Sequence, residues 1–195
     1  MPLELKPFSW ERMIEAVEAV RHRMLKAASA LREAKIPYAV IGGNAVAAWV
    51  SRVDRAAVRN TQDVDVLVRR SDFAGVQTAL ENAGFVYRNI LNVDCFLDTI
   101  DSHPRDAVHI VFAGEKVKPN DLEPTADVTE REIGEGYEVI QLESLVRMKL
   151  TSFRIKDRMH LLDLISVALI DPTWPSRFQP ELGERLQELL NNPDG

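Results

Sequence analysis

The stretch that decides the fold is TQDVDVLV, at residues 61–68. Its β-branched and apolar residues favour a strand over 64–68, although Asp is normally depleted in strands. Side chains two residues apart point to the same face of a strand, so Asp63 and Asp65 project together while the valines point the other way into a core. Two ionised carboxylates on one face of a buried sheet are costly unless a positive charge lies between them.

Carboxylates at this spacing can hold hard cations. The strand rise separates the roots of the two side chains by about 6–7 Å, and magnesium prefers one or two carboxylates together with phosphate and water oxygens. The alternative is that Asp63 and Asp65 simply form ion pairs with Arg59 or Arg69 at the end of the strand. Because the pair lies inside an apolar strand and follows a Gly-Gly turn, we favour metal binding.

The residues upstream read IGGNAVAAW, at 41–49. They predict the end of a strand, a turn at Gly42-Gly43 and a helix over 44–50. Glycine lets the backbone approach a phosphate closely, and the N–H groups at the start of a helix favour an anion. Asn44 can cap this helix or donate a hydrogen bond to a phosphate oxygen. The pattern indicates a phosphate cradle beside the Asp pair, and its alternative is a plain strand-to-helix turn.

The rest of the chain alternates between helical and strand patterns. One helix comes first, mixed strands and helices follow, and helices close the chain, which predicts an α+β or α/β fold with a mixed sheet, flanking helices and a helical C-terminal part. The predicted helices cover 10–35, 44–50, 71–82, 142–170 with a break near Lys156, and 179–191; the predicted strands cover 38–41, 64–68, parts of 85–99, 107–112 and 139–140, and the longest loop is 115–136. The first helix has its inward positions at Ile14, Val17, Val20, Leu25 and Leu31.

Composition excludes several classes of protein. The chain has 195 residues, of which 46% are hydrophobic, and a formal net charge of -6, which argues against coating nucleic acid or membranes by bulk charge. Cys95 is the only cysteine, so an intrachain disulfide and a cysteine zinc site are excluded. The first residues lack the apolar core of a signal peptide, and the most apolar stretch, 161–170, is too short to cross a bilayer. We expect a cytoplasmic protein with no membrane partner.

Together the motifs resemble the polymerase-beta-like nucleotidyltransferase superfamily. The family pattern is a hydrophobic strand, Gly-Gly-Ser or a similar turn, a helix, and then an Asp-x-Asp strand; here it reads Ile41-Gly42-Gly43-Asn44 and later Asp63-Val64-Asp65. The segment LESLVRMKLTSFRIKDRMHLLDL, at 142–164, looks like the C-terminal helical segment of the small bacterial members, the AbiEii-like abortive-infection toxins. The resemblance covers roughly residues 36–170.

The resemblance implies a reaction that depends on magnesium, with manganese as the alternative ion. Family members bind a nucleoside triphosphate with the metal ions on the aspartates, transfer a nucleoside monophosphate to a hydroxyl or phosphate acceptor, and release pyrophosphate. By this resemblance, Asp63 and Asp65 bind the metals, and Gly42, Gly43 and Asn44 hold the triphosphate.

The sequence departs from the family at one position. The family has a third carboxylate on a later strand, whereas the centre of the corresponding stretch, 106–114, is His109. A neutral imidazole can act as a general base near pH 7, but it is a poor ligand for magnesium. We assign His109 to the catalytic set beside Asp63 and Asp65. The other candidates for the third carboxylate are Asp94, Asp98 and Asp106.

The C-terminal helical segment supplies cations. Basic residues there neutralise the triphosphate or the acceptor in the family, and Lys149 interrupts an apolar stripe, so we assign Lys149 and Arg154 to nucleotide binding. The alternative for these residues and for Lys156 is a solvated face of a helix. Asp157 fits a pairing or capping role within that helix.

Three segments and two hypotheses follow. The segments are an N-terminal helix at 1–36, a nucleotidyltransferase core at 37–140 and a C-terminal helical segment at 141–195 that packs on the core. The first hypothesis is a nucleotidyltransferase that uses a nucleoside triphosphate and an acceptor, RNA or protein, which the sequence does not identify. The second is a nucleotide-binding protein that no longer catalyses and has a regulatory or toxin-antitoxin-type role with a partner protein. Position 109 separates the two.

Overall fold

A mixed β-sheet organises the molecule. The computed structural model describes residues 7, 9–103 and 106–193. The first residues of the predicted 1–36 segment and the last two of the predicted 141–195 segment therefore lie outside the described residues. The strands are β1 (Tyr38–Ile41), β2 (Val64–Val68), β3 (Val86–Ile90), β4 (Val93–Leu97), β5 (Ala107–Phe112), β6 (Arg131–Ile133) and β7 (Glu138–Ile140). In this described part they form one seven-stranded sheet in the order β3-β4-β5-β2-β1-β7-β6.

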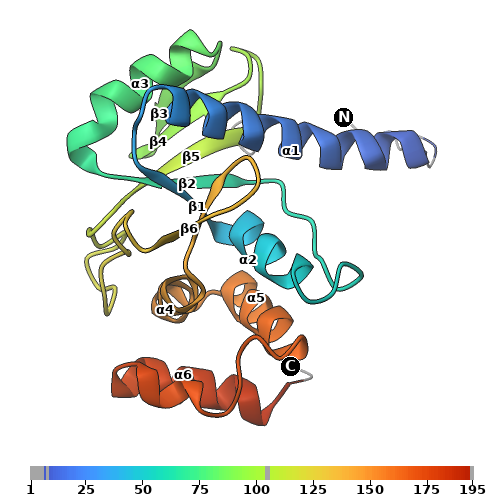
Figure 1. Cartoon of the computed structure of the whole chain (residues 1–195), viewed down its shortest axis with the longest axis vertical. Helices are drawn as coiled ribbons and strands as arrows, with labels where there is room; N and C mark the ends of the chain where they lie inside the picture. The colour runs from blue at the N-terminus through green and yellow to red at the C-terminus, as the bar shows by residue number, and fades with distance from the viewer. Residues whose placement is uncertain (1–6, 8, 104–105, 194–195) are drawn as a thin grey trace, which may run out of the picture.

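Helices cover both faces of this sheet. They are α1 (Trp10–Glu33), α2 (Gly42–Ser51), α3 (Phe73–Asn82), α4 (Leu142–Ser152), α5 (Ile155–Ser166) and α6 (Pro180–Asn191), with short 3₁₀ turns at Arg70–Asp72 and Trp174–Arg177. Figure 1 shows α1 and α3 on one face, and α2, α4, α5 and α6 on the other. This arrangement confirms the predicted mixed sheet with flanking helices and a helical C-terminal part.

Strand β2 lies at the centre and divides the core in two. It runs antiparallel to β1 and parallel to β5. Its valines Val64, Val66 and Val68 are buried against α1 and α3, as the two-residue period predicts, whereas Leu67 is buried in the cluster formed with α2 and the C-terminal helices. Because Asp65 lies on the Leu67 side of the strand, its carboxylate faces the α2 side of the sheet.

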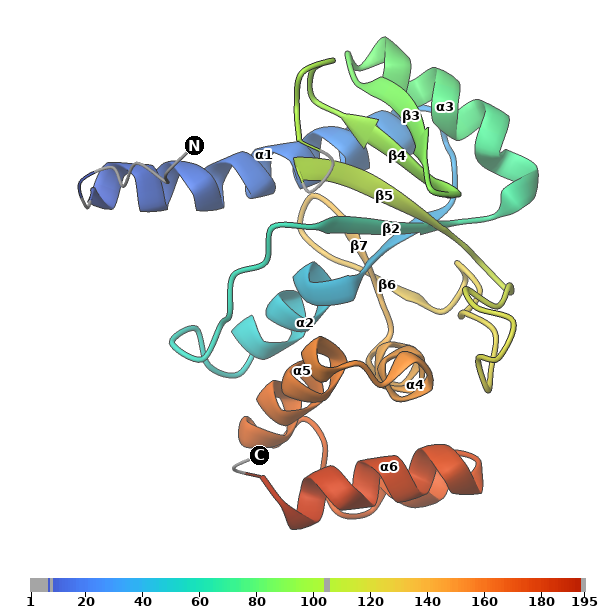
Figure 2. The same ribbon diagram turned by 180° about the vertical axis from the view of Figure 1, so that it is seen from behind.

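Helix α1 is longer than the sheet it covers. Val20 and Leu31 are buried as predicted, but Ile14 is 61% exposed and Val17 is 39% exposed. Figure 2 shows the reason, because the N-terminal half of α1 extends past the edge of the sheet. The prediction that these two residues point into the core is therefore wrong: helical periodicity identifies an apolar face, but it does not tell how far the packing partner extends.

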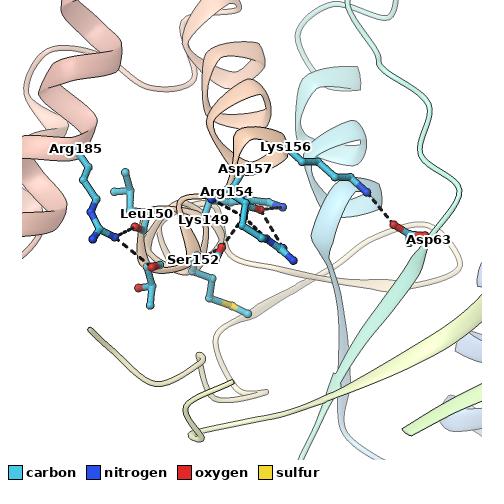
Figure 3. Close-up of polar contacts among 10 residues, drawn as sticks. Asp63, Lys149, Leu150, Ser152, Arg154, Lys156, Asp157 and Arg185 are labelled. Carbon is cyan, nitrogen blue, oxygen red and sulfur yellow. Dashed lines mark hydrogen bonds and ion pairs between the residues drawn. The ribbon is translucent and has the colours of Figure 1, made fainter. Parts of the chain in front are cut away.

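The predicted helix over 142–170 is two helices, α4 and α5, and the break at residues 153–154 lies near Lys156 as predicted. Helix α4 ends at Ser152, and its C-cap residue Phe153 adopts a left-handed conformation with φ 41°. Arg185 of α6 donates hydrogen bonds to the carbonyls of Leu150 and Thr151 in the last turn of α4, and Figure 3 shows this contact. The short turn fixes where α5 begins.

Two further features concern the loops and membranes. Strand β6 lies inside the segment 115–136, for which the sequence predicts a loop, and it pairs with β7 in an antiparallel hairpin. A strand of three residues is too short for its alternation to be recognised in the sequence. Within the described ranges, no helix combines the length and the apolar character needed to cross a membrane.

Candidate active site

One row of residues crosses four strands and sets the geometry of the site. Ile41 of β1 pairs with Asp65 of β2, Asp65 pairs with His109 of β5, and His109 pairs with Cys95 of β4. Residues paired across strands project to the same face. The Nδ1 atom of His109 is therefore 3.6 Å from Oδ1 of Asp65. The structure thus brings together Asp65 and His109, two of the three predicted catalytic residues.

The Gly-Gly turn meets Asp65 directly. Helix α2 begins at Gly42, immediately after β1, and Gly42 has φ +69°. A Cβ atom on Gly42 would lie 2.1 Å from Oδ2 of Asp65, which is inside van der Waals contact. Only glycine both adopts this backbone conformation readily and leaves room for the carboxylate. The Asp65 carboxylate therefore lies next to the N-terminal end of α2, where backbone N–H groups attract anions.

Asn44 has a different task from the predicted helix cap. It lies in the first turn of α2, whose N-cap is Ile41, and its Nδ2 donates a 2.7 Å hydrogen bond to the backbone carbonyl of Asp63. The capping prediction is wrong because the helix starts at Gly42, two residues before the predicted start at Asn44. The bond ties α2 to the residue just before β2, and so it holds the Gly-Gly turn and the Asp pair in register.

Among the described residues, Asp63 and Asp65 do not form ion pairs with the neighbouring arginines. Arg59 pairs with Asp163 at 3.0 Å and Arg69 pairs with Asp127 at 3.0 Å, so the alternative of simple strand-end ion pairs with these residues is wrong. Asp63 instead accepts a 2.8 Å hydrogen bond on Oδ2 from the ammonium of Lys156. Figure 3 shows Lys156 reaching from α5 across to Asp63.

Lys149 and Arg154 converge on a third acidic residue, Asp157. The Asp157 side chain is 1% exposed and accepts from Lys149 at 3.0 Å, Ser152 at 2.7 Å and Arg154 at 2.8 Å. Burial would raise the pKa of Asp157, but Arg154, Lys149 and Ser152 outweigh burial and hold that pKa well below its usual range. Burial lowers the pKa of Lys149, and the charges of Asp157 and Asp65 oppose that shift. Lys149 is thus a buried, neutralised cation rather than part of a solvated face.

These groups line one cleft. Its volume is about 1040 Å³, and it extends from the Gly-Gly turn to the start of α5. Every residue assigned from the sequence to the site lines it except Asn44, whose side-chain amide is bound to the backbone carbonyl of Asp63. The lining residues with a proposed role are Gly42, Gly43, Asp63, Asp65, His109, Lys149 and Arg154, and Lys156 lines it as well.

The candidates for a third carboxylate separate in the structure. Asp94 lines the cleft, but its Oδ1 accepts hydrogen bonds from Tyr87 at 2.7 Å and Asn89 at 2.8 Å. Asp98 pairs at 2.7 Å with Arg23 of α1, the helix on the opposite face of the sheet. Asp106 does not line the cleft. The residue that faces Asp65 in this row is His109.

The donor set fits a metal ion that arrives with phosphate. Among the residues that the structure describes, no three His, Cys, Asp or Glu side chains gather as a ready-made metal site. The two carboxylates are partly open to the cleft, with Asp63 33% and Asp65 29% exposed, and Gly42 leaves space at Oδ2 of Asp65. Magnesium bound by one or two carboxylates takes its remaining ligands from water and phosphate oxygens. Asp63 and Asp65 would hold such an ion, and the triphosphate would complete its coordination.

Two cleft residues have surroundings that the sequence does not indicate. The sequence groups Lys156 with the solvated cations of the C-terminal segment, since no local pattern indicates that its ammonium reaches a residue 93 positions earlier. The sequence also predicts that Asp157 is a capping partner, and it does accept from the backbone N–H of Arg154 at 3.3 Å. Its burial beneath the cleft depends on how α4 and α5 pack, which the sequence pattern does not contain.

Replacement of Gly42 tests the contact between the turn and the carboxylate. We expect Gly42→Ala to lose divalent-metal binding, because the new methyl group must displace Asp65. A matched control is Gly114→Ala, since Gly114 has φ +71° but nothing within 4 Å of the position that a Cβ would take. Both variants carry the backbone cost of roughly 1–2 kcal/mol for a left-handed alanine, measured by urea unfolding. Mn²⁺ binding to Gly42→Ala as tight as to wild type would contradict the expectation.

Comparison with known proteins identifies the class of fold. No protein-family model and no curated protein sequence matches this chain. The solved structures that resemble it have the nucleotidyltransferase fold, as the sequence motifs predict. An antigenic nucleotidyltransferase-like protein from Paracoccidioides brasiliensis superposes with a TM-score of 0.60 and 18% identity, over 92% of this chain and 91% of its own.

Two further structures agree. The antibiotic-resistance factor ANT(2'')-Ia superposes with a TM-score of 0.52 and 13% identity, over 91% of this chain and 92% of its own. JHP933 from Helicobacter pylori superposes with a TM-score of 0.51 and 15% identity, over 96% of this chain and 78% of its own. At these identities the likeness establishes the fold, and the chemistry has to be argued from the site.

Proposed function

We propose that this chain is a metal-dependent nucleotidyltransferase that moves a nucleoside monophosphate from a nucleoside triphosphate to an acceptor. The observation that supports this most strongly is the contact between the start of α2 and Asp65, where a Cβ on Gly42 would lie 2.1 Å from the carboxylate. The contact brings the start of α2, whose backbone N–H groups would bind phosphate, next to a carboxylate that would bind a metal. The fold shared with a nucleotidyltransferase-like protein adds support.

The residues of the cleft have different roles in this proposal. The N–H groups of Gly42 and Gly43 bind phosphate oxygens at the start of α2. The exposed Arg154 contributes positive charge toward the triphosphate, and Lys149, held on Asp157, adds to the positive potential from the wall of the cleft. Asp63 and Asp65 hold magnesium or manganese, which supplies charge neutralisation on the phosphate oxygens. His109 takes the proton from the acceptor hydroxyl as its oxygen attacks the α-phosphorus, and pyrophosphate leaves in line.

The acceptor is proposed as RNA or protein. The net charge of -6 disfavours broad binding to RNA, so a local patch or a docked partner protein has to present the acceptor group. We also propose the AbiEii-like subtype on the sequence resemblance, and a cytoplasmic location because a single cysteine fits a reducing compartment.

A second candidate is a nucleotide-binding protein without catalysis, with a regulatory or toxin-antitoxin-type role. The observation that favours it is His109 itself, which faces Asp65 at 3.6 Å where the family has a carboxylate. If the site has lost activity, Asp65 keeps its nucleotide-associated metal while the acceptor is no longer activated.

Label transfer distinguishes the two candidates. Each nucleoside triphosphate, labelled at the α-phosphate, is incubated with Mg²⁺ or Mn²⁺ and with RNA and protein pools. We expect wild type to transfer label with release of pyrophosphate, and His109→Ala to be about a hundredfold slower, as for a lost general base. His22→Ala, an exposed histidine on α1, is the matched control.

Two outcomes would contradict the enzyme. The first is that wild type binds nucleotide but labels nothing in any pool. The second is that His109→Asp gains transfer that wild type lacks, which would identify an inactivated site. Absence of nucleotide binding by wild type would contradict both candidates.

A further inference from the structure

Lys156 already places a positive charge on the proposed metal site. Its Nζ is 2.8 Å from Oδ2 of Asp63, and the two side chains are 54% and 33% exposed. An ammonium and a divalent ion on the same carboxylate repel each other at this range. The half-exposed position means that the ammonium can leave without creating a buried charge.

The backbone of Lys156 is fixed although its side chain is not. Arg154 and Asp157 flank it, and they are joined by a capping box at the start of α5. Asp157 is in turn held by Lys149 and Ser152 of α4. As Figure 3 shows, this network lies beside Lys156, whose side chain points away from it toward Asp63. The turn therefore keeps the base of a long, flexible side chain within reach of the site.

The charges at the site explain why a cation is needed there. Asp63 and Asp65 place two carboxylates at the start of β2, and Gly42 brings backbone but no charged side chain. Lys149 interacts with Asp65, but its ammonium is bound to Asp157. Asp63 is thus neutralised by Lys156.

Building on the proposed function, we propose that Lys156 is the resident cation of the unloaded site and that a divalent metal binds by displacing it from Asp63. Competition with Lys156 then sets how much free metal the protein requires. The displaced ammonium remains in the cleft, which Lys156 lines together with the Gly-Gly turn. Lys156 is a residue that tunes metal affinity, and it is distinct from the general base and the phosphate-binding groups.

The test is direct binding of Mn²⁺, measured from the EPR signal of the free ion. Lys156→Met removes the charge but keeps an unbranched side chain. Because the position is exposed, we expect the variant to fold like wild type, and the midpoint of urea unfolding checks this. We expect it to bind Mn²⁺ roughly tenfold more tightly than wild type. The expected gain in affinity is modest because solvent screens charges near a partly exposed carboxylate. Lys156→Arg, which keeps the charge, is expected to stay within about threefold of wild type.

Lys118→Met is the matched control. Lys118 also lines the cleft, so its removal lowers the general positive potential without touching Asp63. Tighter binding by Lys156→Met but not by Lys118→Met supports the competition. Equal or weaker binding by Lys156→Met, equal tightening by both variants, or no binding by any variant would overturn it.

The same titration separates this inference from the proposed function. If Lys156→Met tightens Mn²⁺ binding, Asp65→Asn abolishes it, and wild type still transfers no label in any acceptor pool, the competition is established and the enzyme is rejected. If label is transferred but Lys156→Met leaves Mn²⁺ binding unchanged, the enzyme stands and the competition is rejected.

Discussion

Asp65→Asn is expected to slow nucleotidyl transfer by about a thousandfold or more. The amide has nearly the same shape but no charge, and a metal on this site is expected to supply several kcal/mol of charge stabilisation in the transition state. Asp65 is the carboxylate in contact with both the Gly-Gly turn and His109. The measurement is the initial rate of label transfer at saturating Mg²⁺ and nucleoside triphosphate.

The control for this variant is Asp101→Asn. Asp101 is exposed in the segment between β4 and β5 and does not line the cleft. It should transfer label at the wild-type rate. Transfer by Asp65→Asn within a few fold of wild type would remove Asp65 from the catalytic set and with it the main support for the proposed function.

Asp157→Asn is expected to lower the free energy of unfolding by about 3 kcal/mol. The substitution leaves the ammonium of Lys149, 8% exposed, without its charged partner, and breaking one side of a buried ion pair typically costs this much. The measurement is equilibrium urea unfolding, with a lower midpoint and an unchanged slope. An exposed pair provides the contrast: Glu188→Gln, which removes the partner of Arg158, is expected to cost under about 1 kcal/mol.

Acid should reduce the difference between wild type and Asp157→Asn. The pKa of Asp157 lies well below its ordinary value of 3.8 in the folded protein, so the unfolded chain takes up the proton first as the pH falls. The stabilisation from this carboxylate is therefore complete above about pH 4 and declines progressively below it. If the difference in free energy of unfolding between wild type and Asp157→Asn stayed constant down to about pH 2, the charge of Asp157 would not be the cause of its stabilisation.

The sequence predicts the strand-turn-helix arrangement around the site well. The alternation in 61–68 indicates which side chains enter the core, and Val64, Val66 and Val68 are buried accordingly. Position 109 stands out from its place in a predicted strand, and the register confirms that it lies opposite Asp65. These predictions succeed because strand alternation and turn chemistry are encoded in residues that are neighbours in the chain.

The errors have one common origin. Ile14 and Val17 fit an inward helical face, but the sheet ends before it reaches them. Asn44 fits a cap, but the strand passes directly into the helix at Gly42. Both outcomes depend on the length and position of a neighbouring element, which local patterns do not report.

What the sequence by itself determined is the mixed α/β fold, the Gly-Gly turn and the Asp-x-Asp strand that share one end of the sheet. Tertiary structure alone decided which charges meet. Asp63 pairs with Lys156 rather than Arg59 or Arg69, and Lys149 is buried on Asp157. The reason is physical: ion pairs between residues far apart in the chain depend on how α5 packs against α2 and α4. Long basic side chains can reach several partners until that packing is fixed.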